Sequence, residues 1–389
     1  MKRLLTILIV LLLAGGALFA QTRLDAVAPK DARTMAMGGA FVAMSEGYQS
    51  LYGNPASFAD KKAELTLLSV TPWVYVSPTR DNINTFQGLI EGGGEDQGAI
   101  ISALSDLITT NGFGVGASAG LGWVGRGLGL GLVGGMDTYI SGKTLLGSSG
   151  TFDGQVAGVV GIGVPLNLGP FRLQIGGDVR PYLRMTGEIV GTDMIGLLAG
   201  SSDSDAAFDP MTLPVDVGFG LAVDLGATLE LGKLVSVGLA VRDISTKQNF
   251  AESTVGEVLA TLEDGSLPEG DPSEYAMLPN LTVGARLTPI PTFLRPLVDV
   301  TVIAEIQDPV RVIQDNTSMW NLFHVGAEAD LLGGLFAVRA GFNKGWISLG
   351  AGIDLLLLEV NVAVFTEEMG PRPGDRGRTG VSAEVAVRF

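Results

Sequence analysis

The sequence has no cysteine among its 389 residues and only one histidine, His324. Without cysteine there are no disulfides, thiolate metal ligands or thiol nucleophiles. A single histidine also removes most histidine-based metal sites and histidine-dependent catalytic triads. The pattern Gly129-x-Gly131-x-x-Gly134 matches a dinucleotide fingerprint by letter, but it falls inside an expected strand and opens no helix. The sequence therefore predicts no enzyme and no cofactor.

Basic residues are also scarce. The chain has 25 Lys and Arg against 41 Asp and Glu, which gives a formal net charge of −16. A protein this acidic is repelled by phosphate backbones and by anionic surfaces. Nucleic acid is therefore excluded as a partner.

Beyond the N-terminus the sequence lacks any apolar run of the roughly 18 residues that a membrane helix needs. Hydrophobic residues nevertheless make up 46% of the chain, and the mean hydropathy is +0.37. There are 56 glycines, about twice the usual share of roughly 7%. High hydropathy without long apolar runs is typical of strands that are apolar on one face only.

Residues 1–20 have the form of a secretion signal. Lys2 and Arg3 are followed by the apolar run Leu4–Leu13 and then by mostly small residues up to Ala20. Cleavage is expected after Ala20. No cysteine follows, so a lipoprotein anchor is excluded and the mature chain is predicted to be exported.

Strict alternation of apolar and polar or small residues recurs from Glu64 to the end of the chain. In Val298–Gln307, for example, Val300 and Val302 fall on one face and Thr301 on the other, because side chains of a strand alternate with a period of two. The expected strands run to about 10–14 residues, which suits tilted membrane-crossing strands better than a soluble sandwich. Fourteen strands are predicted: 64–76, 112–125, 127–141, 151–165, 171–188, 214–231, 234–245, 279–289, 296–307, 319–331, 334–343, 345–354, 356–366 and 378–389.

The connections between these strands mostly alternate between long and short, apart from a short one near Asn343. Outer-membrane barrels combine short periplasmic turns with longer external loops. We therefore predict that residues 61–389 form an all-β, transmembrane antiparallel β-barrel of about 14 strands in the bacterial outer membrane. The long extracellular loops are expected at 77–111, 189–213 and 246–278.

The last expected strand ends at Phe389, on the same face as Val385 and Val387. A final strand with a terminal aromatic matches the assembly signal of outer-membrane barrels. The expected partners are therefore the barrel-assembly machinery, through Phe389, and outer-membrane lipid.

Residues 21–60 are too apolar for a solvated tail and too broken for a strand. The spacing of Met37, Phe41 and Met44 suggests one or two helical turns, and Asn54-Pro55 forces a turn after them. Such a segment needs a cavity to fill. We predict that residues 21–60 form a hatch inside the barrel lumen.

Three of the external connections carry apolar residues at helical spacing. Two interpretations remain open: helices packed on the barrel rim, or an apolar groove that catches a hydrophobic ligand. The residues concerned are Ile100, Ile101, Leu104, Leu107 and Ile108; Ile189, Val190, Met194, Ile195, Leu197 and Leu198; and Val255, Val258, Leu259 and Leu262.

The N-terminal motif Met37-Gly-Gly-Ala-Phe-Val-Ala43, with Arg33 and Asn54-Pro55-Ala56, resembles the FadL family of outer-membrane transporters for long-chain fatty acids and other hydrophobic compounds. Similarity continues in Leu278–Gly284 and Arg339–Phe342 and looks closest to divergent members seen in spirochaetes. The resemblance implies fourteen strands, an N-terminal hatch and passive transport of hydrophobic small molecules. A related branch, similar to PorV, serves protein secretion. The alternatives are therefore a secretion or adhesin role and a general porin.

Within the hatch, the apolar residues Met35, Met37, Phe41 and Met44 are expected to contact the ligand at the inner end of its path. Asn54, Pro55 and Ala56 are expected to hold the hatch closed. Inward-facing arginines are available as partners for Asn54, namely Arg242, Arg286 and Arg339. A static plug that only stabilises the barrel is the alternative. His324 is expected to face the lumen near Glu328, and mixed inward charges are expected to form cross-strand ion pairs that bind the hatch.

Overall fold

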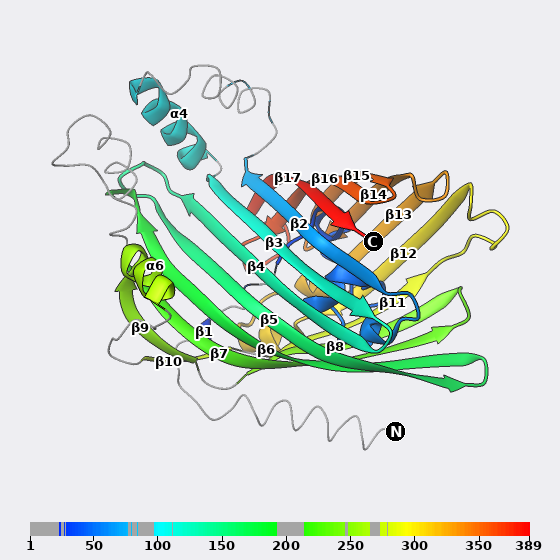
Figure 1. Cartoon of the computed structure of the whole chain (residues 1–389). Helices are drawn as coiled ribbons and strands as arrows, with labels where there is room; N and C mark the ends of the chain where they lie inside the picture. The colour runs from blue at the N-terminus through cyan, green and yellow to red at the C-terminus, as the bar shows by residue number, and fades with distance from the viewer. Residues whose placement is uncertain are drawn as a thin grey trace.

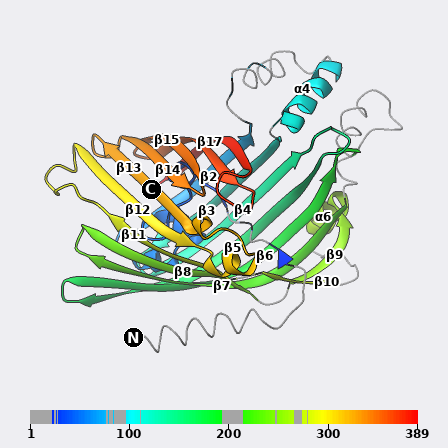
Figure 2. The same cartoon turned by 180° about the vertical axis from the view of Figure 1, so that it is seen from behind.

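Fourteen antiparallel strands close into a barrel in the computed structural model, which describes residues 23–24, 27, 29–76, 79, 84, 97–110, 112–192, 214–245, 248–264, 273–277 and 279–389. The strands follow the chain around the barrel, from β2 to β8 and from β11 to β17 (Figures 1 and 2). Two antiparallel pairings, β8 with β11 and β17 with β2, complete the circle. The predicted fold and strand number are confirmed.

The barrel strands are β2 Glu64–Tyr75, β3 Gly114–Gly125, β4 Leu128–Ser141, β5 Ser149–Leu168, β6 Phe171–Val190, β7 Pro214–Leu231, β8 Val235–Ser245, β11 Asn280–Leu287, β12 Val298–Gln307, β13 Phe323–Leu331, β14 Phe336–Asn343, β15 Trp346–Leu355, β16 Leu358–Glu368 and β17 Gly377–Arg388. The register is continuous across most pairs. It shifts in the pairs β17–β2, β2–β3 and β7–β8. The β5–β6 pair has a gap next to Pro181, which has no N–H to donate, but keeps the same register on both sides of it.

The outer face of the barrel is apolar and the inner face is polar or small. In β14, for example, Phe336, Val338 and Phe342 are exposed, whereas Arg339 and Asn343 are buried toward the lumen. A closed antiparallel barrel with an exposed apolar exterior is stable only where lipid covers that exterior. The chain is therefore a barrel of the bacterial outer membrane.

The barrel is markedly uneven in height. We call β4–β7 the long wall, because these strands contain 14, 20, 20 and 18 residues. The short wall is β11–β16, in which β13 and β14 contain only nine and eight residues. Figure 1 shows the long green strands opposite the short yellow and orange ones. Most of the short turns lie at the end where β2 begins and β17 ends, which identifies that end as periplasmic; the two-residue turn Lys344-Gly345 between β14 and β15 is the exception at the external end.

The expected loop 246–278 instead contains two further strands. β9 Gln248–Thr254 pairs with β7, and β10 Ser273–Met277 pairs with β9, so they extend β8 and β11 beyond the membrane. Similarly, Ile189 and Val190 end β6 and do not begin a helix. Backbone pairing here continues past the region where lipid imposes apolar alternation. Residues Arg23–Leu24 form β1, parallel to β10.

Two expected loop helices are present, α4 Gln97–Thr110 and α6 Val255–Asp264. A short helix, α7 Pro309–Gln314, and the 3-10 turn η4 Met319–Leu322 connect β12 to β13. No helix in the described part of the chain is long and apolar enough to cross a membrane. The expected signal, residues 1–20, lies outside the described residues.

Candidate functional site in the lumen

The hatch enters the lumen through a single helical turn, α2 Ala32–Ala36. Asp31 caps this turn by accepting a hydrogen bond from the Thr34 backbone N–H at 2.7 Å. Gly38 and Gly39, with φ of 68° and 81°, then end it. A Cβ at Gly38 would lie 2.8 Å from the backbone nitrogen of Phe342, so only glycine fits against this wall. The helical turns expected over Met37–Met44 are therefore wrong, because the helix ends before them.

The second part of the hatch comprises two 3-10 turns, η1 Gly47–Leu51 and η2 Pro55–Ala59. Asn54 is fully buried between them. Its Oδ1 accepts from the Ala56 backbone N–H at 3.1 Å, and its Nδ2 donates to the Val42 carbonyl at 2.8 Å and to Thr228 Oγ1 at 3.2 Å. The expectation that Asn54 pairs with a lumen arginine is wrong. Its partner on the wall is a threonine.

Glycines of the wall create the space that η2 occupies. A Cβ at Gly176 would lie 2.0 Å from the Pro55 carbonyl oxygen, and one at Gly226 would lie 2.1 Å from Asn54 Oδ1. Phe58 is seated against Gly129 and Gly161 in the same way. The high glycine content of the sequence is thus explained in part by close approach of hatch and wall.

We expect Gly226→Ala to unseat the hatch while leaving the barrel folded. The added methyl group meets Asn54 Oδ1 at 2.1 Å and has no room to move away from the strand. Overpacking of this kind costs about 1–3 kcal/mol. Channel recordings in planar bilayers should show new openings. Gly135→Ala is the matched control, because its Cβ would meet no atom closer than 3.4 Å. If the two variants remain equally closed in these recordings, close packing of Gly226 against Asn54 does not hold the hatch in place.

Charged and polar groups of the short wall fasten the hatch. Arg33 of the hatch binds Glu328 through two hydrogen bonds of 2.6 and 2.8 Å, and Arg339 of the neighbouring strand binds the same carboxylate. His324 faces the lumen, with Nδ1 2.7 Å from the Gly38 carbonyl oxygen. Glu305 accepts from the backbone N–H of Phe41 at 3.0 Å. The expected inward ion pairs are present, and Glu328 links one of them to the hatch.

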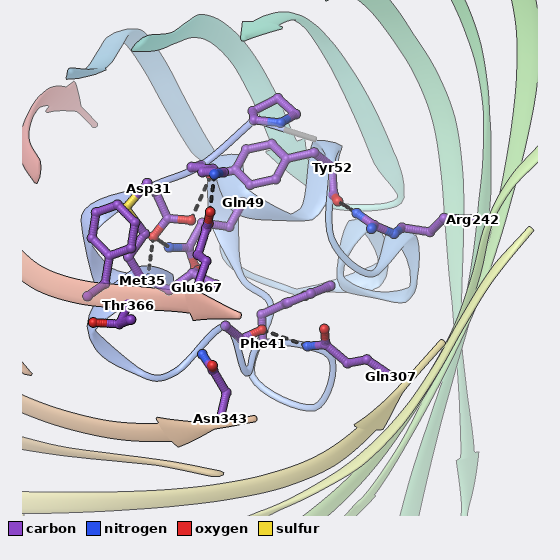
Figure 3. Close-up of a pocket in the computed structure, with 15 residues that line it drawn as sticks. Asp31, Met35, Phe41, Gln49, Tyr52, Arg242, Gln307, Asn343, Thr366 and Glu367 are labelled. Carbon is purple, nitrogen blue, oxygen red and sulfur yellow. Dashed lines mark hydrogen bonds and ion pairs between the residues drawn. The ribbon is translucent and has the colours of Figure 1, made fainter. Parts of the chain in front are cut away.

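Above the hatch lies a cavity of about 240 Å³, which we call the upper cavity. Gln307, Asn343 and Glu367, at the external ends of β12, β14 and β16, contribute to its lining, and Figure 3 shows them around the hatch segment. The apolar hatch side chains Met35 and Phe41 line it, whereas Met37 and Met44 are buried elsewhere, against the wall. The lining residues are Pro29, Lys30, Asp31, Thr34, Met35, Gly39, Phe41, Gln49, Tyr52, Arg242, Gln307, Asn343, Phe365, Thr366 and Glu367.

A second cavity of about 790 Å³, the vestibule, lies on the periplasmic side of the hatch. Charged residues dominate its lining, among them Lys62, Arg172 and Asp354. Gln49 lines both the vestibule and the upper cavity. The two cavities are therefore separated at this point by a single layer of hatch side chains.

That layer is closed by hydrogen bonds to one buried carboxylate. Gln49 Nε2 donates to Asp31 Oδ1 at 2.8 Å, and the Tyr52 hydroxyl donates to Asp31 Oδ2 at 3.1 Å. Burial, and then the adjacent Asp31 carboxylate, raise the pKa of Tyr52 well above its ordinary value, so it remains a neutral donor. We call Asp31, Gln49 and Tyr52 the latch.

Arg242 gives the upper cavity a distinctive charge. Its Nη1 donates to the Tyr52 carbonyl oxygen, and its guanidinium lies 5.3 Å from the centre of the Phe41 ring. The side chain is buried, and its Nε has no hydrogen-bond partner. No carboxylate among the described residues lies within ion-pair distance of it. Four carboxylates, those of Asp178, Asp224, Glu305 and Asp308, nevertheless lie near enough to interact with it electrostatically. A buried guanidinium without a direct ion pair can still accept an anionic group beside it.

The loop groove is only partly described. Ile101 and Leu104 belong to α4, and in the same helix Leu107 and Ile108 are buried. In α6, Val258 is buried against Val215 and Val217 of β7, which favours helices packed on the barrel. Ile195 and Leu198 lie outside the described residues.

Sequence reasoning found Met35 and Phe41 in the hatch but missed most of the cavity lining. Gln307, Asn343 and Phe365 come from three separate strands, and only the barrel register brings them together. Arg242 stood out only as an inward charge. In the described ranges no group of three or more histidine, aspartate and glutamate side chains is placed to hold a metal.

No protein-family model and no curated protein sequence matches the chain. Solved structures that are similar to it include the following three. The P. putida toluene transporter TodX is 12% identical over 93% of this chain and 98% of its own, with a TM-score of 0.45. The Ralstonia pickettii toluene transporter TbuX is 12% identical over 92% and 98%, with a TM-score of 0.46. A Pseudomonas aeruginosa FadL homologue is 10% identical over 93% and 98%, with a TM-score of 0.41.

Proposed function

We propose that the protein is a passive outer-membrane channel for hydrophobic small molecules that carry an acidic group, such as long-chain fatty acids. The observation that carries this proposal is the upper cavity, which lies against the hatch and combines apolar side chains with a guanidinium that has no direct ion pair among the described residues. Ligand sites commonly combine an apolar lining with a few placed polar groups. The latch then stands between a bound ligand and the vestibule.

The size of the upper cavity limits how a ligand is held. Its 240 Å³ is below the roughly 300–1,000 Å³ of typical ligand pockets. A long acyl chain would therefore place only its acidic end here, with its tail directed toward the external loops. Phe41 and Met35 would contact the first carbons of the chain, and Arg242 would bind the carboxylate.

Release toward the vestibule requires the latch to open. A ligand carboxylate at Arg242 would lie beside Tyr52, whose carbonyl already binds that arginine. Competition for the guanidinium would loosen Tyr52 and with it the bond from Tyr52 to Asp31. In this proposal the ligand itself starts the opening of the hatch, and no energy source is needed. An open porin would need no such apolar plug.

We expect Arg242→Met to weaken binding of an acidic ligand selectively. A hydrogen bond to a charged group contributes about 1.5–3 kcal/mol, so laurate or oleate should bind about 10–100-fold more weakly. A neutral hydrocarbon of similar length should bind equally well or better. Binding to the purified barrel can be followed by calorimetry, with uptake of the labelled acid measured in cells.

Arg286→Met is the matched control, because Arg286 is an inward-facing arginine that does not line the upper cavity. Equal loss of acid binding in both variants would indicate a general effect of lumen charge. Unchanged binding and uptake in Arg242→Met would refute the acidic-ligand proposal. Failure of the wild-type protein to take up any acid or hydrocarbon would refute the transport role itself and would favour a role in secretion.

A further inference from the structure

The short wall is too low to cover the apolar layer of a membrane by its strands alone. β14 has eight residues, which at about 3.4 Å per residue and a tilt of about 40° rise roughly 20 Å. The apolar band of such barrels is about 25 Å tall. Neighbouring β13, with nine residues, is little higher. Residues outside the strands must therefore lie within the apolar layer on this side.

The periplasmic turns of the short wall have the composition that this requires. Their tips carry Phe293, which is 78% exposed, Leu332, which is 61% exposed, and Leu356, which is 93% exposed. We call these three residues and their turns, 288–297, 332–335 and 356–357, the apolar rim. On the long wall the corresponding turns are Arg126-Gly127, Gly169-Pro170 and Gly232–Leu234, in which Leu234 is an exposed apolar residue, at 50%. The most exposed apolar turn residues are thus on the side where the strands are short.

Backbone conformation adds a second cost at two of the rim leucines. Leu332 and Leu356 have positive φ, at 54° and 69°. Leucine is disfavoured in this region of backbone space, where glycine and asparagine are the usual residues. A leucine that is both strained and exposed to water would be unfavourable twice. Contact with acyl chains would remove the cost of exposing the side chain to water, and the free energy gained would offset the cost of the strained backbone.

The apolar rim also contains few charged residues. Turns 332–335 and 356–357 contain no charged residue, and turn 288–297 contains one, Arg295. The Arg295 guanidinium is folded back onto the backbone, where it donates to the carbonyls of Ile290, Lys233 and Thr288 at 3.0, 3.0 and 3.2 Å. The rim is continuous with the exposed Phe336, Val338 and Ile353 of the lipid-facing wall.

We propose that the apolar rim is inserted into the periplasmic leaflet of the outer membrane, among phospholipid acyl chains. The periplasmic ends of the two walls then lie at different depths relative to the bilayer. On the long wall the periplasmic turns project into water, and on the short wall they end inside the leaflet. A soluble periplasmic protein is the other possible occupant, but continuity with the lipid-facing wall favours phospholipid.

The absence of cysteine allows a direct test by single-site labelling. Leu356→Cys and Leu332→Cys carry an environment-sensitive fluorophore after folding into phosphatidylethanolamine and phosphatidylglycerol vesicles. Arg126→Cys is the matched control, because Arg126 occupies a turn at the same barrel end, is exposed and also has positive φ, at 56°. Folding of each variant is checked by heat-modifiable gel mobility.

The two rim positions should show blue-shifted emission, strong quenching by acyl-chain spin labels and weak quenching by aqueous iodide. Arg126→Cys should show the reverse. Iodide quenching of both rim positions at the level of Arg126→Cys, in vesicles without other proteins, would overturn the proposal and leave a protein partner as the occupant. If either cysteine variant fails to fold, the other rim position and Phe293→Cys provide the same readout.

Discussion

Deleting residues 21–58 should convert the closed barrel into a water-filled channel. Eight-stranded barrels are filled by their own side chains, whereas barrels of 16–18 strands enclose an aqueous pore. A barrel of 14 strands is closer in size to those that enclose a pore. Many of its inward-facing residues are glycine, such as Gly176 and Gly226. Without the hatch these positions leave open space. Single-channel conductance and uptake of polar solutes should both rise by about an order of magnitude or more.

The same deletion distinguishes a gate from a static plug. If the hatch gates transport, the remaining barrel stays folded, leaks polar solutes and no longer discriminates acidic ligands from neutral ones. If the hatch only stabilises the barrel, thermal stability falls and the surviving barrels have unchanged permeability. A shorter deletion of residues 21–28 is the control, because it retains the contacts of Lys30, Arg33 and Asn54.

Replacement of Glu328 by glutamine should strongly lower the free energy of unfolding. Glu328 is 2% exposed and binds the guanidinium groups of Arg33 and Arg339. Removing its charge leaves the buried Arg339 with only the amide oxygen of Asn361, at 2.7 Å, whereas the half-buried Arg33 keeps Glu46, at 2.8 Å. Breaking a buried ion pair from one side costs about 3–5 kcal/mol. Urea unfolding in lipid vesicles measures this loss.

Asp315→Asn supplies the comparison for Glu328→Gln. Asp315 pairs with Arg311 at 3.4 Å, but both side chains are more than 40% exposed, so its loss should cost about 0–1 kcal/mol. The double variant Glu328→Gln/Arg339→Gln should be less destabilised than the sum of its two single changes, because the groups interact. Equal unfolding midpoints for Glu328→Gln and Asp315→Asn would show that the cluster does not hold the hatch.

The barrel was predictable because lipid imposes a simple rule on its strands. Where one face meets acyl chains and the other meets the lumen, apolar residues alternate with polar or small ones, as in Phe336–Asn343. β9 and β10 were missed because they pair beyond the lipid, where neither face must be apolar. The hatch was recognised from its composition, but its helix was misplaced. Met37, Phe41 and Met44 have helical spacing, but they pack from irregular backbone into one apolar cluster that includes Ala240 and Ile303 of the wall.

The site was less predictable than the fold, for a related reason. Met35 and Phe41 lie in one continuous apolar segment, so a local pattern was enough to select them. Arg242, Asn343 and Phe365 are brought together by strand register and by the curvature of the closed sheet. No pattern along the chain encodes that proximity. The pairing of Asn54 with Thr228 likewise depends on how deeply η2 sits over Gly226.

The hatch also has a consequence for the order of assembly. It precedes β2 in the chain, yet α2 packs against β14–β17, the last strands, while η2 packs against β5–β7. The complete seat of the hatch therefore does not exist until β17 has paired with β2. Pairing of β17 with β2 and final docking of the hatch are therefore expected at the same late stage of folding, because contacts between residues this distant in sequence form late. A barrel whose last strand has not yet paired therefore cannot hold the hatch in its fully docked position.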